Sequence, residues 1–74
     1  MDFIIRMVWD GAAERWAAIG SPGMGLVLES ESFDALIERV KTAAPEMIEL
    51  NYDYVGPITL RFITERTDRV EAVS

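Results

Sequence analysis

The sequence predicts an α+β domain with the element order β-β-β-α-β. Side chains alternate between two faces over residues 3–9, a helical apolar stripe runs from residue 33 to 48, and residues 58–65 alternate again. A right-handed crossover through the helix lays the last strand parallel to the first, which gives the spatial strand order 3-2-1-4. The 74 residues are expected to form one domain, because a chain this short holds a single thin core.

The first two strands are predicted to form a hairpin. Residues 3–9 alternate, and Asp10-Gly11 opens a loop because Asp-Gly favours positive φ. Residues 15–19 are predicted to form the returning strand, in which Trp16 could pair with Trp9 across the hairpin. We interpret the two tryptophans as a cross-strand core pair beneath the helix, while interface anchors are the alternative.

A glycine-rich turn separates the second strand from the third. Residues 20–25 contain three glycines and one proline, a composition typical of turns. A phosphate-binding loop runs into a helix N-terminus and usually supplies a lysine. This segment has no lysine and leads into a further strand at residues 26–29, so we interpret it as a structural turn.

The helix is predicted to begin after Ser32, a good N-cap residue, with Asp34 complementing the dipole in the first turn. Its apolar stripe consists of Phe33, Leu36, Ile37, Val40, Ala44, Met47 and Ile48. Pro45 lacks an N–H group and predicts a kink or a break, after which residues 45–50 would form a separate short helix. Asn51 is the predicted C-terminal cap.

The final strand is predicted at residues 58–65, and residues 66–74 either extend it or fray. The helix covers one sheet face and leaves the other without cover. That open face carries Ile4, Arg6, Val8, Arg61 and Ile63. An uncovered face and open strand edges both favour association, so we expect a homo-oligomer.

The charge of the chain favours a cationic protein partner. Thirteen acidic and seven basic residues give a net charge of −6, which argues against nucleic acid, whose binding depends on Lys and Arg at phosphates. Residues 29–50 hold six acids against two bases, a local net charge of −4. Solubility alone is the alternative explanation. The candidate partner-binding residues are Glu29, Glu31, Asp34, Glu38, Trp9 and Trp16.

The composition also excludes most kinds of catalytic and metal-binding site. Without histidine or cysteine, the usual nucleophilic, proton-shuttling and zinc-binding constellations are absent, and so are disulfides. A carboxylate-only mechanism stays formally open, but the acids fall on a strand end and an exposed helix face. We therefore expect no enzyme, no cofactor and no metal. No apolar run approaches the ~20 residues that span a bilayer, and no signal peptide is visible, so we expect a cytoplasmic protein.

An ordered series of short motifs resembles a known family. Trp9-Asp10, Trp16-Ala17-Ala18, Gly25-Leu26, the S-F-x-x-L pattern from Ser32 and the P-E-x-x-E-L-N pattern from Pro45 occur in this order. The series resembles the HicB-like antitoxin superfamily over residues 3–51, and within it the short single-domain branch of unassigned function.

The resemblance implies a partial ribonuclease-H-like fold with the same element order. It also implies a partner, because HicB-type proteins neutralise a small basic HicA-type mRNA-cleaving toxin by docking on it and covering its catalytic histidine. Many such proteins carry a further DNA-binding domain, for which 74 residues leave no room, so we expect no nucleic-acid binding by this domain. The alternative is a homo-oligomeric scaffold or small-ligand sensor without a toxin.

Overall fold

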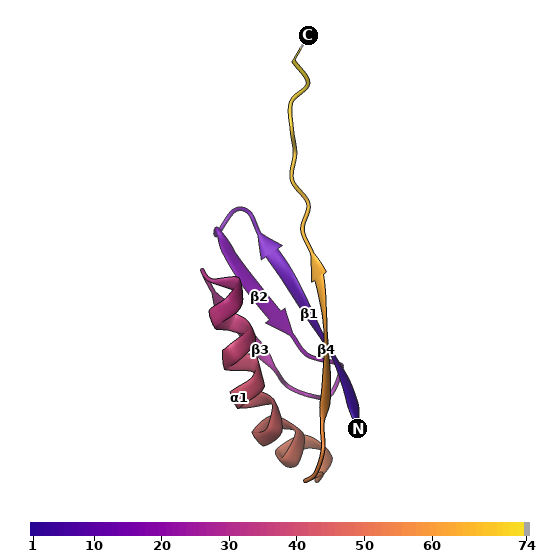
Figure 1. Cartoon of the computed structure of the whole chain (residues 1–74). Helices are drawn as coiled ribbons and strands as arrows, with labels where there is room; N and C mark the ends of the chain where they lie inside the picture. Colours follow the sequence, from indigo (N-terminus) through magenta and orange to yellow (C-terminus); the bar gives the residue numbers. More distant parts are fainter. Residues whose placement is uncertain (74) are drawn as a thin grey trace.

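The computed structural model describes residues 1–73 and has the predicted order of elements (Figure 1). These elements are β1 (Asp2–Asp10), β2 (Arg15–Ile19), β3 (Val27–Ser30), α1 (Phe33–Tyr52) and β4 (Thr59–Glu65). The sheet order is β3-β2-β1-β4, in which β2 is antiparallel to β1 and to β3, while β4 is parallel to β1. The predicted α+β fold and strand order are confirmed.

The strand register gives the sheet one inner and one outer face. Trp9 lies opposite Trp16, as predicted, and Phe3 lies opposite Leu60. Residues that face each other across a ladder point to the same side of the sheet. The inner face, covered by α1, therefore carries these four side chains, whereas Ile4 and Ile63 lie on the outer face.

The core lies between the inner sheet face and α1, which packs over β2 and β3 (Figure 1). Ten apolar side chains are buried there: Phe3, Ile5, Met7, Ala18, Met24, Leu26, Leu36, Val40, Ala44 and Ile48. Within residues 1–73 the core contains no polar or charged side chain. The four buried helix residues recur at a spacing of four, as an amphipathic helix requires.

The two ends of α1 differ in how well the sequence predicts them. Ser32 is the N-cap, and its hydroxyl accepts a hydrogen bond from the Ala35 N–H at 3.2 Å. The helix continues through Pro45 to Tyr52, so the predicted separate helix at residues 45–50 is wrong. The predicted cap at Asn51 is also wrong, because Asp53 adopts the left-handed conformation and donates its N–H to Glu49.

The glycine-rich turn packs against the C-terminal end of α1. Asn51 donates from its side-chain nitrogen to the Met24 carbonyl at 2.9 Å, and the Tyr52 hydroxyl donates to the Pro22 carbonyl at 2.8 Å. Gly25 has a φ of 75°, and a Cβ there would lie 3.2 Å from the Met47 methyl carbon. The approach of helix and turn therefore requires glycine at this position.

Replacing Asn51 with alanine should lower the free energy of unfolding by about 1–2 kcal/mol, since it removes two hydrogen bonds, one of them partly buried. Urea denaturation followed by circular dichroism measures the change. Thr42→Ala is the matched control, because its hydroxyl bonds only the Glu38 carbonyl of the same helix. Equal midpoints for the two variants would show that Asn51 does not hold the turn.

The chain leaves the domain after β4. Of the nine residues predicted to extend the last strand or to fray, residues 66–73 are described, and Ser74 lies outside the described residues. Residues 66–73 form no regular element and are exposed along their whole length. They run on from the end of β4, away from the sheet and helix (Figure 1). We call residues 66–73 the tail.

Candidate functional site

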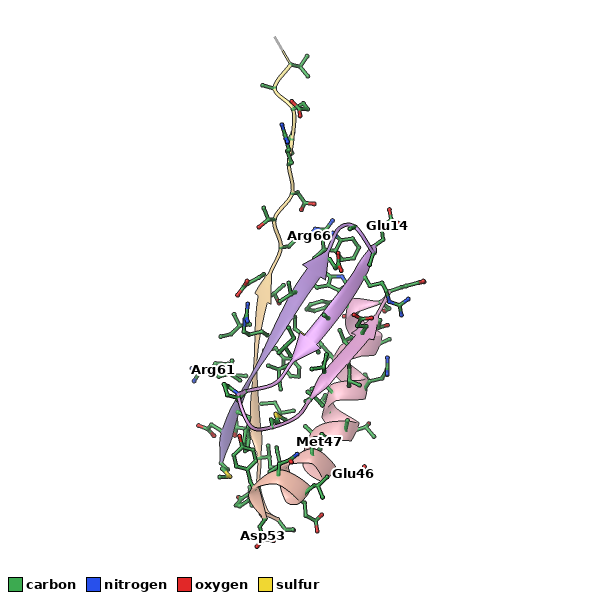
Figure 2. All side chains as sticks on the ribbon, turned by 180° about the vertical axis from the view of Figure 1, so that it is seen from behind. Glu14, Glu46, Met47, Asp53, Arg61 and Arg66 are labelled. Carbon is green, nitrogen blue, oxygen red and sulfur yellow. The ribbon has the colours of Figure 1, made fainter. Side chains whose placement is uncertain are left out.

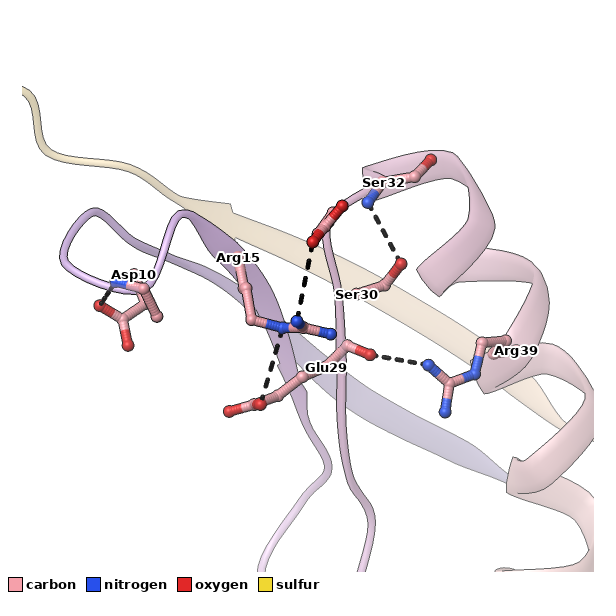
Figure 3. A network of polar contacts seen from close by, with 8 residues as sticks. Asp10, Arg15, Glu29, Ser30, Ser32 and Arg39 are labelled. Carbon is pink, nitrogen blue, oxygen red and sulfur yellow. Dashed lines mark hydrogen bonds and ion pairs between the residues drawn. The ribbon is translucent and has the colours of Figure 1, made fainter.

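Two of the predicted acids, Glu29 on β3 and Glu31 just before α1, lie beside arginines of the same chain (Figure 3). Arg15 on β2 places its Nε 3.9 Å from the Glu29 carboxylate and its Nη1 3.9 Å from that of Glu31. Arg39 on α1 donates to the backbone oxygen of Glu29 at 2.7 Å. Pairing of β2 with β3 thus brings positive charge to two of the four acids that the sequence singled out.

The other two predicted acids lie along the exposed side of α1. Glu38 pairs with Lys41 at 3.2 Å, in an exposed i,i+3 ion pair. Asp34 is exposed in the first turn, where its charge complements the helix dipole. The structure therefore does not bring the four predicted acids together as one uncompensated patch.

A different set of acids gathers at the other end of the helix. Glu46, Glu49 and Asp53 surround Leu50 and line a shallow hollow of about 490 Å³. Leu50 is 78% exposed. Across residues 1–73, none of these three carboxylates forms an ion pair. We call these four residues the acidic helix end, and Figure 2 shows Glu46 and Asp53 at the opposite end of the sheet and helix from Arg66.

The charge at the acidic helix end opposes the stability of the helix. The C-terminus of a helix carries a partial negative charge, so cations stabilise it and anions destabilise it. The last turn of α1 contains no basic residue. Sequence reasoning included Glu46 and Glu49 in an acidic run but did not select them, although the P-E-x-x-E-L-N spacing without a following Lys or Arg was a usable signal.

The predicted tryptophans form an aromatic cluster near the start of α1. The rings of Trp9 and Trp16 are 5.4 Å apart, and Phe33 meets Trp16 edge-on at 4.8 Å. Both tryptophans are half-buried. The guanidinium of Arg66 lies 4.5 Å from the centre of the Trp9 ring, an arrangement typical of a cation–π contact. The sequence did not indicate this role for Arg66, the first residue of the tail.

The outer sheet face is largely uncovered, as predicted. Ile4 is 43% and Ile63 is 42% exposed, and a shallow pocket of about 460 Å³ lies beside Ile4. The pocket is lined by Ile4, Arg6, Ile19, Gly20, Ser21 and Pro22. The charges on this face are mixed, since Arg6 pairs with Glu65 at 3.2 Å. It offers apolar contact without a net charge of one sign.

Within the described part of the chain, no group of three or more acidic side chains is arranged to hold a metal ion. No helix of residues 1–73 combines the length and the apolar character that crossing a bilayer demands. The two surfaces that stand out are the acidic helix end and the outer sheet face.

Fold and surfaces together define a small α+β domain with one covered and one open sheet face. The chain belongs to the family called "Domain of unknown function (DUF1902)", whose model matches residues 2–74. It is also similar to the crystal structure of hypothetical protein TTHA1013 from the extremely thermophilic bacterium Thermus thermophilus. That similarity has a TM-score of 0.77 and 25% identity, and covers 95% of this chain and 100% of the other. No curated protein matches the chain.

Proposed function

We propose that this domain is a non-catalytic binding module that captures a small basic protein at the acidic helix end. The observation that carries the proposal is the set of three unpaired carboxylates around the exposed Leu50. An apolar anchor ringed by charges of one sign matches the usual layout of a binding patch, with an apolar centre and a polar rim. The overall charge of −6 adds long-range attraction for a basic partner.

The energetic cost of the patch supports a binding role. Glu49 lies in the last turn of α1, where a lysine would interact favourably with the helix dipole and an acid does not. Leu50 exposes most of its side chain to water without contributing to the core. A basic protein docked on this end removes both penalties, because it neutralises the carboxylates and covers the leucine.

The resemblance to HicB-type antitoxins supplies the chemical class of the partner. HicA-type toxins are small and basic, as the charge of this surface requires. The motif P-E-x-x-E-L-N, which contributes to the resemblance, includes Glu46, Glu49 and Leu50 of the acidic helix end. We therefore propose a HicA-type toxin as the partner.

Co-expression with a HicA-type toxin encoded in the same genome tests the proposal. The expected result is a complex that survives gel filtration and restores growth to cells that express the toxin. A toxin that remains fully active in the presence of excess domain would refute the proposal. Leu50→Lys, which replaces the exposed apolar anchor with a charge that repels a basic partner and suits the helix C-terminus, should abolish the rescue while leaving the fold intact.

Neutralising the acids should change stability and binding in opposite directions. The double variant Glu46→Gln/Glu49→Gln relieves repulsion at the helix C-terminus, so its free energy of unfolding should rise by about 0.3–1 kcal/mol. Its association rate with the toxin should fall and depend less on salt, because electrostatic steering weakens. Thermal denaturation and stopped-flow binding at two salt concentrations measure the two effects.

Glu31→Gln is the control for this pair of measurements. It removes an exposed acid at the other end of α1, where Arg15 lies nearby. The acidic helix end is the wrong surface if Glu31→Gln slows association as much as the double variant does. In that case the acids first predicted from the sequence would be the better candidates.

A further inference from the structure

The tail has an extended backbone and touches the rest of the chain chiefly at its first residue. Arg66 pairs with Asp68 at 2.8 Å and Arg69 pairs with Glu71 at 3.3 Å. Ion pairs between residues two apart indicate an extended chain, in which alternate side chains share one side. Val70 is 86% and Val73 is 97% exposed. An extended segment with exposed apolar side chains therefore projects from the domain (Figures 1 and 2).

The tail belongs to the family domain and is not an addition to it. The family model extends to residue 74. The similarity to the crystal structure of TTHA1013 covers 95% of this chain, which leaves about four of 74 residues outside it. Residues 66–74 number nine, so about five or more of them have counterparts in that protein. An extended segment with exposed apolar side chains is suited to pairing with another strand.

The open edge of β4 is the pairing surface next to the tail. β4 is an edge strand of seven residues, paired on one side with β1. The other edge strand, β3, has four residues, and its Glu29 carbonyl already accepts a hydrogen bond from Arg39. A long edge strand without such protection is a template for pairing with another chain.

We propose that β4 and the tail pair, antiparallel, with the same segment of a second copy of this chain. Two such copies are related by a two-fold axis perpendicular to the sheet. Residues that face each other across the two-fold axis point to the same side of the sheet, so both numbers are even or both are odd. The sum of the two numbers is therefore even, and the residue at half this sum faces the same residue of the second copy. Symmetry thus permits only registers that are centred on a single residue.

The charges distinguish the three centres at the base of the tail, residues 66, 67 and 68. A register centred on Arg66 puts two arginines face to face, and one centred on Asp68 puts two aspartates together and Glu65 opposite Glu71. Centred on Thr67, the pair places Arg66 opposite Asp68 of the second copy and Glu65 opposite Arg69 of the second copy. Opposite charges that face each other across strands are favourable, whereas like charges are unfavourable.

The same register places two small apolar tail residues beside the inner-face residues of β4. Residues 69–73 of one copy lie along residues 61–65 of the other. Even-numbered residues of β4 point to the inner face, where Phe62 is only half-buried. Val70 and Ala72 of the second copy then fall beside Thr64 and Phe62, on this apolar side. Arg69 and Glu71 fall on the outer face, where the charges of β4 lie, and Val73 lies there opposite Arg61.

The tail leaves the sheet at Arg66, whereas Asp53 of the acidic helix end lies at the opposite end of the sheet and helix (Figure 2). Arg66 marks the base of the tail, and Asp53 marks the far end of α1. A dimer formed through β4 and the tail leaves both copies of the acidic helix end free. The inference does not depend on the proposed function, and either can fail without the other.

Sedimentation of the full chain should show a dimer that is lost when residues 69–74 are removed. Arg69→Glu should weaken the dimer about tenfold or more, because Glu65 would face a second acid at two symmetric positions. Glu65→Arg should weaken it similarly, and an equimolar mixture of the two variants should restore the dimer. A full chain that stays monomeric at millimolar concentration, or a dimer that survives the truncation, overturns the inference.

Cysteine cross-linking tests the register, since the chain has no cysteine of its own. Thr67→Cys should oxidise to a disulfide-linked dimer, because facing Cα atoms in an antiparallel pair lie about 4.5–5.5 Å apart. Asp68→Cys is the matched control, whose two thiols would be offset along the strands and too distant to bridge. Efficient cross-linking at residue 68 without cross-linking at residue 67 refutes the centre on Thr67.

Discussion

Leu36→Ala should lower the free energy of unfolding by about 2–5 kcal/mol, the usual cost of truncating a fully buried leucine. Leu36 lies in the first half of α1, is completely buried and belongs to the single core. Domains are stable by roughly 0.05–0.15 kcal/mol per residue, or about 4–11 kcal/mol for this chain. The substitution therefore removes a large share of the total, and a marked population of unfolded chains is expected at 37 °C.

Leu50→Ala is the control for this measurement. It makes the same change in the same helix, but at a side chain that is 78% exposed, so its effect should stay within about 0.5 kcal/mol. Urea denaturation of both variants, followed by circular dichroism at 222 nm, gives the two values. Similar losses for Leu36 and Leu50 would mean that α1 does not bury the face described above.

The fold was predictable because local patterns specify most of it. The spacing of apolar residues in α1 defines its buried side, and Ser32 marks its start by local chemistry alone. The end of α1 was not predictable in this way. Asn51 resembles a cap in the sequence, yet its side chain bonds the Met24 carbonyl, 27 residues away, while Asp53 takes the left-handed position. Tertiary contact decided between two plausible caps.

The candidate site was less predictable, because charge compensation depends on the pairing of distant strands. Glu29 and Glu31 look unpaired in the sequence, but β2 brings Arg15 beside them. Glu46 and Glu49 look similar to those acids, and no basic side chain of residues 1–73 forms an ion pair with them. A run of acids in the sequence therefore does not reveal which of its members keep their charge uncompensated.

The sequence alone did not decide whether the tail extends the last strand or frays. Its alternating charges become informative only when β4 is known to be an edge strand and the faces of its residues are assigned. Arg66 illustrates the same point, because its contact with Trp9 joins the tail to a hairpin more than fifty residues earlier. Neither the position of the tail beside an edge strand nor the contact of Arg66 with Trp9 can be recognised from neighbouring residues in the sequence.

Trp16→Ala should lower the free energy of unfolding by about 2–3 kcal/mol, somewhat less than the 3–5 kcal/mol typical of a fully buried aromatic residue. Trp16 links three neighbours: Trp9 across the hairpin, Phe33 on α1 and Arg66 of the tail. Trp9→Ala is the matched control and should cost less, because Phe33 meets Trp16 directly. Equal costs would argue that Phe33 does not pack the helix onto the hairpin through Trp16.

A double-mutant cycle separates the role of Arg66 from that of the rings. Trp9→Ala and Arg66→Ala should show a coupling energy of about 0.5–1 kcal/mol, the value expected for an exposed cation–π pair. Truncating the chain after Asp68 should leave that coupling unchanged, since it keeps both the contact with Trp9 and the Arg66–Asp68 ion pair. If the coupling disappears on truncation, the later tail residues hold Arg66 against Trp9. If it is absent from the full chain, the base of the tail is not anchored and the pairing register centred on Thr67 loses its fixed starting point.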